Sequence, residues 1–472
     1  MIKFGTDGWR AVIAEDFTFE NLKIVSQAIA DHLRRSHPFR DRSNKTAKRK
    51  KVVIGYDRRF LSREFAETVG CVLAANKIKV SLSDQDVPTP AVSYHCYNKS
   101  YDLGIMITAS HNPAKFNGLK IKTSEGGSAD KSLTDKVERL LGRRKPKYMD
   151  ITLAKKKNLI QSRDLTQDYI GFLRKFINIK RVKQLKLKVL VDVMYGSGNN
   201  FVERILGSSN LKVDYLHNEF NPSFGGIHPE PIASNLGELI YKVKTGKYDM
   251  GIVLDGDADR IAMIDERGNY INAQVILPLL AIHMIKNRKI KGGIAKTVVG
   301  SNLVDKVAFS LGVACYETPV GFKYISRLFK DKLICIGGEE AGGIGFKGYI
   351  PERDGSAAFL LLLEMVAFEG KKFSTLLAKF YKQYGRYYYS RTAIPIKSVK
   401  RSLSDMKLPT YLCGQKVERI NTLDGIKLIA KDSWLMFRKS GTEPIVRVYA
   451  ESKSRKKAKS LVTLGKNKVY AL

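Results

Sequence analysis

Short apolar runs, each ending in a loop rich in Gly, Ser or Asp, recur along the chain. The clearest runs lie at 52–56, 104–108 and 250–254, and helical patterns at 18–35 and 62–75 flank the first of them. Runs this short and this rich in β-branched residues are typical of buried strands. Because strands alternate with helices, the pattern predicts an α/β fold, in which ligands bind at the carboxyl ends of the strands.

Length and composition fit a globular protein of several domains. At about 100–200 residues per domain, 472 residues predict three or four domains, and a hydrophobic content of 44% is enough for several cores. No apolar run reaches the roughly 18 residues of a membrane span, and MIKFGTDGWR does not resemble a signal peptide. Five scattered cysteines without a CxxC pair predict reduced thiols in a cytoplasmic protein.

The net charge of +36 is unusual, with 82 Lys and Arg against 46 Asp and Glu. Such an excess fits an anionic partner, and nucleic acid is the first candidate. The basic stretches at 34–51 and from Lys453 onward contain no recognisable nucleic-acid module, so nucleic acid is not expected as a partner. A lysine-rich composition together with a phosphorylated substrate explains the charge more simply.

The apolar run at 104–108 leads into the sequence Ala-Ser-His-Asn-Pro. Small polar residues followed by proline cannot extend a central strand, so Ser110 is predicted on a loop at the end of the strand. Asn117-Gly118 then predicts a turn, and 119–122 predicts an outgoing strand. A serine at the end of a sheet, flanked by cations, can carry a phosphoryl group. The alternative is an ordinary solvated serine.

A second polar loop follows the run at 250–254 and carries three carboxylates at alternate positions, which can converge on one hard cation. The spacing resembles an EF-hand, but Arg260 occupies the position that requires glycine and 261–264 resumes a strand, so an EF-hand is excluded. Mg²⁺ would need further oxygens, which water or a phosphate on Ser110 could supply. The alternative is a solvated acidic turn. The three carboxylates are those of Asp255, Asp257 and Asp259.

Three further loops carry side chains suited to a phosphorylated sugar. Two acids among glycines at 337–343 suit sugar hydroxyls, and the loop at 318–323 offers a lysine. The stretch at 438–447 combines arginines with hydroxyls and predicts an anion cradle. By contrast, the GxG at 196–198 lacks the third glycine of a dinucleotide fingerprint. The loop at 221–232, with three prolines, has no role that the sequence reveals.

Taken together, these motifs resemble those of the α-D-phosphohexomutase superfamily, and they occur in the expected order along the whole chain. The likeness is greatest to the bacterial phosphoglucomutase/phosphomannomutase group. The motifs are FGTDGWR, TASHNP with FNGLKIK, DGDADR, GEEAGG and RKSGTEPIVRVY, which resemble the N-terminal signature, phosphoserine loop, metal loop, sugar loop and phosphate loop.

The resemblance implies three related α/β domains around a central cleft and a C-terminal α+β domain, with boundaries at 1–148, 160–266, 267–372 and 373–472. It implies a mutase that interconverts hexose 1-phosphate and hexose 6-phosphate, of glucose and/or mannose, through a phosphoserine and a bisphosphorylated sugar. It also implies a single Mg²⁺ in each chain, glucose 1,6-bisphosphate as activator, and a monomer or homodimer.

By family position, Ser110 is phosphorylated in the active form and Lys120 transfers protons. The residues implied to assist them are Arg10, His111 and Arg260. The implied metal ligands are Asp255, Asp257, Asp259 and the phosphoserine at Ser110. The residues implied to bind the sugar and its non-reacting phosphate are Glu339, Gly321, Lys323, Arg438, Ser440, Gly441, Thr442 and Arg447.

Two positions depart from the pattern of the superfamily. Relatives commonly have Ser where this sugar loop has Ala341, and some have His at the position of Gly343. A lost hydroxyl hydrogen bond costs about 0.5–1.5 kcal/mol, so the departures bear on the choice of sugar more than on the reaction. Phosphoglucosamine mutase therefore stays an alternative; a sugar phosphatase and a basic nucleic-acid-associated protein are two others.

Overall fold

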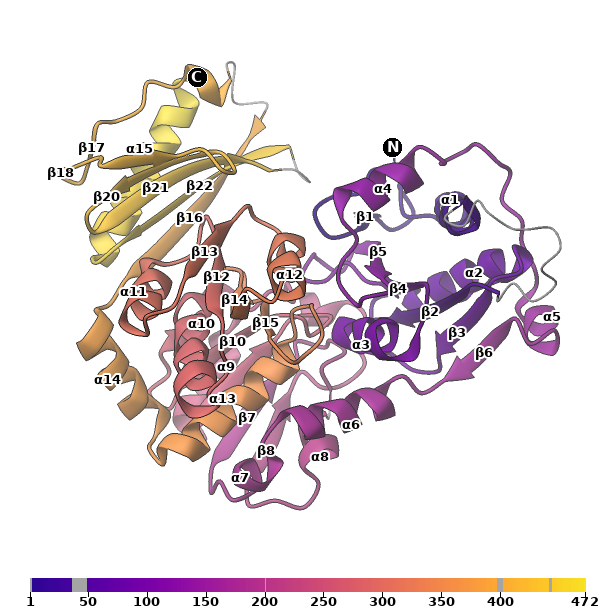
Figure 1. Cartoon of the computed structure of the whole chain (residues 1–472), viewed down its shortest axis with the longest axis horizontal. Coiled ribbons are helices and arrows are strands. Elements are labelled where there is room, and N and C mark those ends of the chain that lie inside the picture. Colours follow the sequence, from indigo (N-terminus) through magenta and orange to yellow (C-terminus); the bar gives the residue numbers. More distant parts are fainter. Residues whose placement is uncertain (1, 36–48, 200, 397–401, 441–443) are drawn as a thin grey trace. The chain divides into compact units, whose positions relative to one another are not determined.

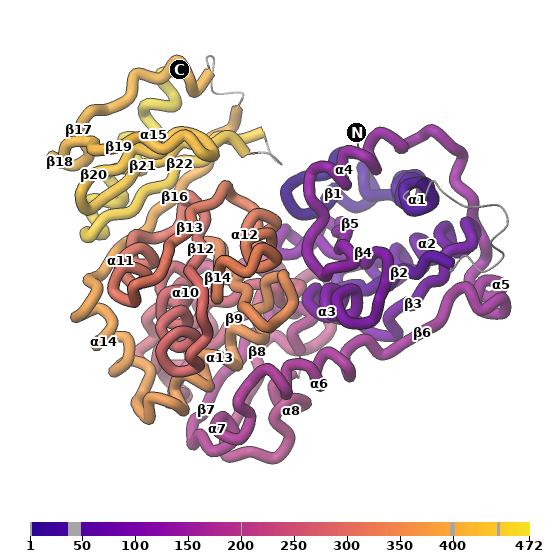
Figure 2. Tube along the Cα trace, in the orientation of Figure 1, coloured from indigo at the N-terminus to yellow at the C-terminus, as the bar shows by residue number. Residues whose placement is uncertain are grey.

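The chain divides into two compact units in the structure, which is a computed structural model. The first unit is formed by Met1–Asn272 with Ala341–Phe373, and the second by Ala273–Glu340 with Ser374–Leu472. Figures 1 and 2 follow the chain by colour from the N-terminus to the C-terminus. None of the helices in the described part combines the length and hydrophobicity of a membrane span. The structure describes residues 2–35, 49–199, 201–396, 402–440 and 444–472.

The first sheet has the strand order β1-β5-β4-β2-β3-β6 (Figure 1). The four strands from β4 to β6 in this order run parallel, whereas β5 is antiparallel to both β4 and β1. The strands are β1 (Trp9–Val12), β2 (Lys51–Tyr56), β3 (Lys79–Ser83), β4 (Leu103–Ile107), β5 (Phe116–Thr123) and β6 (Ile160–Arg163). The accompanying helices are α1 (Phe19–Arg35), α2 (Ser62–Ala75), α3 (Thr89–Lys99), α4 (Lys131–Glu138) and α5 (Ile151–Lys156).

Helices cover both faces of this sheet. α1 and α2 bury Val25 and Phe65 in the core on one face. On the other face α3 comes close because Gly55 and Gly104 lack side chains: a Cβ on Gly104 would lie 3.0 Å from Val92 Cγ1. Every residue of β4 is buried, which explains why its sequence is continuously apolar and does not alternate.

The predicted turn at Asn117-Gly118 is wrong, because both residues lie inside β5 and pair with β1. Glycine is needed there for close packing of backbones: a Cβ on Gly118 would lie 2.6 Å from the carbonyl oxygen of Thr108 and 2.7 Å from that of Trp9. The chain reverses between β4 and β5 in the loop at 108–115, which carries the predicted phosphoserine.

We expect Gly118→Ala to destabilise the protein by about 1–3 kcal/mol, because the added methyl group would press on two main-chain oxygens. Chemical denaturation curves measure this change. The matched control is Gly171→Ala in α6 (Thr166–Phe176), where a Cβ meets nothing within 4 Å. Alanine should stabilise that helix by about 0.5–1 kcal/mol. Effects of the same sign and size at both sites would contradict the close packing of β1 against β5.

The second sheet of the first unit has the order β11-β10-β9-β7-β8, with β10 antiparallel to both β9 and β11. The buried helix α13 (Gly355–Glu369) packs against β9 and β10, and the loop between those two strands carries the three predicted metal ligands. The strands of this sheet are β7 (Lys188–Asp192), β8 (Lys212–Leu216), β9 (Met250–Leu254), β10 (Ile261–Asp265) and β11 (Tyr270–Ile271). The unit also contains β15 (Ile344–Phe346), which is not part of this sheet. The other elements are α7 (Ile179–Lys183), α8 (Phe201–Leu206), α9 (Gly237–Thr245), η1 (Phe224–Gly226) and η2 (Ala233–Asn235).

In the second unit, β12 (Gly293–Thr297) pairs in parallel with β13 (Cys315–Thr318) on one side and with β14 (Ile334–Gly338) on the other. Strands and helices alternate here, which is the predicted α/β pattern. The helices are α10 (Ala273–Ile282), η3 (His283–Asn287), α11 (Asn302–Ser310), α12 (Phe322–Lys330) and α14 (Phe373–Tyr384).

The C-terminal part of the second unit is an antiparallel sheet of order β16-β22-β21-β20-β19, covered by α15 (Arg455–Tyr470). A helix segregated onto an antiparallel sheet is an α+β arrangement. The predicted fold class, α/β domains followed by a C-terminal α+β domain, is confirmed. The elements are β16 (Tyr388–Pro395), η5 (Leu403–Asp405), β17 (Tyr411–Leu412), β18 (Gln415–Lys416), β19 (Arg419–Asn421), β20 (Ile426–Ala430), β21 (Ser433–Lys439) and β22 (Ile445–Ser452).

Candidate active site

Ser110 lies in the loop between β4 and β5, and it is completely buried. Its φ of +54° is in the left-handed region, which costs a residue with a side chain about 1–2 kcal/mol. The main-chain N–H of Ser110 donates to Thr108 Oγ1 at 2.8 Å, and its Oγ donates to Asp255 Oδ2 at 3.0 Å. The predicted phosphoserine loop and the predicted metal loop are therefore in direct contact.

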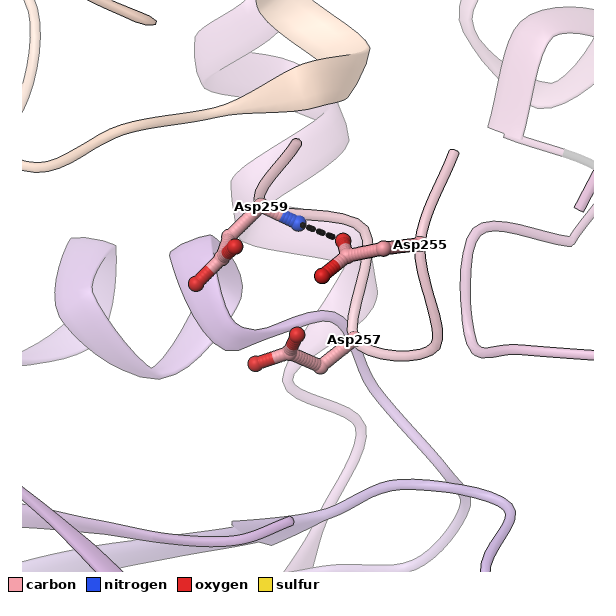
Figure 3. Close-up of side chains that lie close together, drawn as sticks. All are labelled: Asp255, Asp257 and Asp259. Atoms are coloured by element: carbon pink, nitrogen blue, oxygen red, sulfur yellow. Dashed lines mark hydrogen bonds between the residues drawn. The ribbon is translucent and has the colours of Figure 1, made fainter. Parts of the chain in front are cut away.

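The three aspartates of the metal loop point toward one another (Figure 3). One carboxylate oxygen from each of Asp255, Asp257 and Asp259 lies within 4.8 Å of the others, and all three residues are fully buried. Asp255 Oδ1 accepts hydrogen bonds from the main-chain N–H groups of Asp259 (3.0 Å) and Arg260 (3.1 Å), which fixes the turn of the loop. The three carboxylates therefore converge in the structure, as their alternate spacing allows.

The acidic triad fits a divalent cation. Among the described residues, Asp257 Oδ1 and Asp259 Oδ1 are buried without a hydrogen-bond partner, and carboxylate oxygens left in this state suit a hard cation. Burial raises the pKa of Asp255 well above its ordinary value, and repulsion by Asp259 and Asp257 adds to the increase. A cation among the three oxygens would neutralise that repulsion.

Lys120 projects from β5 into the same cluster and is 1% exposed. Its Nζ lies 2.7 Å from Asp257 Oδ2, 3.0 Å from Asp259 Oδ2 and 2.9 Å from Asp7 Oδ2. Burial alone would lower the pKa of Lys120, but attraction to these three carboxylates raises it above its ordinary value. The three carboxylates therefore favour the charged form of the lysine.

The other predicted catalytic residues surround this cluster. Arg10 lies on β1, where its Nη1 donates to Asn112 Oδ1 at 2.7 Å and its Nη2 lies 3.6 Å from Asp7 Oδ2. Arg260 Nε lies 3.8 Å from an oxygen of Asp255 and 3.8 Å from one of Asp259. His111, partly exposed, directly follows the buried serine.

Arg353 is a site residue that sequence analysis missed. It is 4% exposed, its Nη2 donates to Asp7 Oδ2 at 2.5 Å, and its Nε lies 2.9 Å from Asp259 Oδ2. Its aliphatic stem fills the space beside Gly343, where a Cβ would lie 2.3 Å from Arg353 Cδ. A side chain at position 343 would therefore displace the stem of Arg353.

Asp7 and Thr89 were also missed. Asp7 is the common partner of Lys120, Arg10 and Arg353; burial alone would raise the pKa of Asp7, but these cations lower it well below its ordinary value. Thr89 Oγ1 donates to Asp257 Oδ2 at 2.5 Å and orients that carboxylate. The only local signal was the presence of Asp7 inside the FGTDGWR motif and of Arg353 in a charged triplet.

The predicted substrate-binding residues lie in the second unit. Arg438 on β21 stands opposite Arg447 on β22, and Ser440 follows at the end of β21. Asp424 Oδ2 accepts hydrogen bonds from Arg438 Nε at 2.7 Å and from the main-chain N–H of Val320 at 2.9 Å. Asp424 therefore ties β21, which leads into the predicted phosphate loop, to the loop before α12 that ends at Gly321. Lys323 lies in the first turn of α12 and not on the predicted loop. Glu339 is only partly exposed after β14, and Gly441 and Thr442 lie outside the described residues.

Comparison with known proteins places these loops in one family. Over 467 residues the chain is 30% identical to the phosphoglucomutase/phosphomannomutase of Thermococcus kodakarensis, covering 98% of this chain and 97% of the relative. The chain belongs to the phosphoglucomutase/phosphomannomutase family. The family models match domain I at 1–147, domain II at 167–268, domain III at 272–384 and the C-terminal domain at 393–463.

Other members of this family are similar over the whole chain. The phosphoglucosamine/phosphogalactosamine mutase of Sulfurisphaera tokodaii is 28% identical, over 97% of each chain. The crystal structure of a candidate phosphomannomutase from Thermus thermophilus has a TM-score of 0.85 at 30% identity, covering 99% of this chain and 98% of that one.

As a member of this family, the protein is a mutase, an isomerase that interconverts hexose 1-phosphate and hexose 6-phosphate. The predicted superfamily and the predicted reaction are therefore confirmed. The predicted domain boundaries and the roles of individual residues stay predictions.

Proposed function

We propose that Ser110 carries the phosphoryl group in this mutase. The observation that supports this role is its buried Oγ, held 3.0 Å from Asp255 Oδ2 in the acidic triad. Phosphorylated Ser110 would transfer its phosphoryl group to the free hydroxyl of a hexose monophosphate. The resulting bisphosphate turns over, and its other phosphoryl group returns to the Ser110 oxygen.

We assign the stabilisation of charge around Ser110 to residues of the first unit. Asp255, Asp257, Asp259 and the phosphoserine would hold Mg²⁺, which supplies Lewis-acid catalysis and charge neutralisation when bound. We assign Lys120, which lies among these carboxylates, to proton transfer. The proton that the attacking sugar hydroxyl loses would balance the proton that Ser110 Oγ gains as the phosphoryl group leaves, and the reverse step would return it. We assign Arg10, His111 and Arg260 to the support of the transferring group.

The second unit would bind the part of the sugar phosphate that does not react. Its opposed arginines suit a phosphate because a guanidinium binds phosphate oxygens in a bidentate manner. We assign the sugar hydroxyls to the carboxylate that follows β14 and to the N-terminal end of α12 with its lysine. The proposed residues are Arg438, Ser440, Gly441, Thr442 and Arg447 for the phosphate, and Glu339, Gly321 and Lys323 for the sugar.

The proposed substrates are the phosphates of glucose and/or mannose, with glucose 1,6-bisphosphate as activator. Glucosamine phosphate is the alternative, because Ala341 cannot donate the hydroxyl hydrogen bond that Ser would provide. We further propose a cytoplasmic protein that acts as a monomer or homodimer.

³¹P NMR tests the proposed reaction directly. With Mg²⁺, a trace of glucose 1,6-bisphosphate and glucose 1-phosphate, we expect a growing 6-phosphate signal and no inorganic phosphate, because the phosphoryl group passes only between serine and sugar. Mannose 1-phosphate and glucosamine 1-phosphate, run in parallel, rank the sugars by rate. Stoichiometric release of free phosphate would instead indicate a phosphatase.

A further inference from the structure

Arg59, which follows β2, binds the loop that carries Ser110. Its side chain has no exposed surface. Nη1 donates to the carbonyl oxygens of Pro113 at 2.9 Å and Phe116 at 3.0 Å. Nη2 donates to those of Ser110 and Asn112, both at 2.6 Å. Each terminal nitrogen of a guanidinium has two hydrogens, so these four main-chain carbonyls use all of them.

Asp57 extends this arrangement to the other side of Ser110. Its Oδ2 lies 3.2 Å from Arg59 Nε and accepts a hydrogen bond from Thr108 Oγ1 at 2.5 Å. Because the threonine hydroxyl donates to Asp57, its lone pairs are left to accept the main-chain N–H of Ser110 at 2.8 Å. The carbonyl of Ser110 is thus held by Arg59, and its N–H by Thr108.

Phe224 covers one face of the Arg59 guanidinium. The ring centroid lies 4.8 Å from the guanidinium carbon, and Phe224 is fully buried in η1. A planar cation stacked on an aromatic ring is fixed in direction as well as position. The loop at 221–232, to which the sequence assigned no role, therefore orients the group that holds the serine loop.

The backbone of Ser110 needs such support. A left-handed residue with a side chain persists only where its surroundings determine the conformation, and the φ of Ser110 is +54°. Arg59 and Thr108 bind the two peptide groups that flank this residue, whereas its Oγ donates, within the described part of the chain, to Asp255 alone. Arg59 can thus act on the serine only through the main chain.

We infer that Arg59 is a positioning residue for phosphoryl transfer, which holds the carbonyls of the serine loop so that Ser110 Oγ faces the acidic triad. This inference rests on the proposed role of Ser110 as phosphoryl carrier. Lysine at this position keeps the charge, but its single nitrogen cannot bind four carbonyls in two directions.

The test is the rate of one phosphoryl transfer in Arg59→Lys. Protein phosphorylated on Ser110 is mixed with excess glucose 1-phosphate and Mg²⁺, and loss of phosphoserine is followed by rapid quench. We expect the first-order rate constant to fall by about 10–100-fold, because a small displacement of Ser110 Oγ misaligns the reacting groups. KM should be nearly unchanged. A smaller fraction of folded protein would not alter that rate constant, so a purely structural role predicts no change.

Neighbouring residues provide the controls. Arg58→Lys should keep the wild-type rate constant, because Arg58 pairs with Asp86 at 3.0 Å and donates to the carbonyl oxygen of Asn218, outside the serine loop. Thr108→Val should slow the transfer because it removes the acceptor for the Ser110 N–H, and Thr108→Ser, which keeps the hydroxyl, should restore it.

Two results would overturn the inference. A wild-type rate constant in Arg59→Lys would overturn the positioning role of Arg59 and leave the role of Ser110 intact. If the wild-type phosphoenzyme transferred no phosphoryl group, both the role of Ser110 and that of Arg59 would be wrong. If Arg59→Lys does not fold, the two Thr108 variants provide the test. A normal rate constant in Thr108→Val would overturn the inference. A lower rate constant in Thr108→Val, together with a normal one in Thr108→Ser, would support it.

Discussion

Ser110→Ala is expected to abolish turnover, with a loss of at least roughly 10⁴-fold, because no other group can carry the phosphoryl group between the two positions of the sugar. Sugar-phosphate binding should be largely kept, because the substitution removes only one hydroxyl and its bond to Asp255. Alanine should also accept the left-handed backbone about as well as serine does. Coupled assays measure turnover, and calorimetry with glucose 1-phosphate measures binding.

The matched control is Ser93→Ala. Ser93 on α3 is equally buried, and its hydroxyl has no hydrogen-bond partner among the described residues, so its removal should leave activity near that of the wild type. Intact mass measured after incubation with glucose 1,6-bisphosphate should show one added phosphoryl group in this control and none in Ser110→Ala. Near-normal turnover of Ser110→Ala would refute the phosphoserine mechanism.

The elements that position the site could be predicted because their signals are local. The strand before Ser110 and the one before the acidic loop are fully buried, so their sequences are apolar without interruption, and each ends where polar residues begin. The alternate spacing of the three aspartates likewise predicted that their carboxylates converge, since a tight loop can bring the side chains of residues two positions apart to the same side of the loop. The error at Asn117-Gly118 arose because a glycine required for close packing between strands has the same local sequence as a turn.

The charge partners of the site could not be predicted, because they come from distant parts of the chain. Arg353 and Asp7 are 346 positions apart, and Arg59 reaches carbonyl oxygens more than 50 positions away. Nothing in the composition distinguishes these arginines from the many others. Only the fold shows that they are buried, and a buried cation has to be paired. The reason for glycine at position 343 could not be predicted either, because the space beside Gly343 is filled by the aliphatic stem of Arg353.

Asp257→Asn is expected to weaken the Mg²⁺ dependence and the rate together. The asparagine keeps one oxygen but loses the charge, so a hard cation is bound at least about tenfold more weakly and the Mg²⁺ concentration for half-maximal activity rises. Lys120 also loses the nearest of its three carboxylates, at 2.7 Å, so its proton and position are less well held. We expect a fall in kcat of roughly 10²-fold at saturating Mg²⁺.

The measurement is a Mg²⁺ titration of mutase activity after removal of metal with EDTA. Asp214→Asn is the control, because this aspartate of β8 is half exposed and its partner Lys188 lies 3.7 Å away, with no contact to the acidic triad. The control should titrate as the wild type does. If the Mg²⁺ titration of Asp257→Asn were unchanged while kcat fell, Asp257 would be no metal ligand, and its role would lie in holding Lys120. If both were unchanged, the buried contacts of Asp257 with Lys120 and Thr89 would serve stability alone.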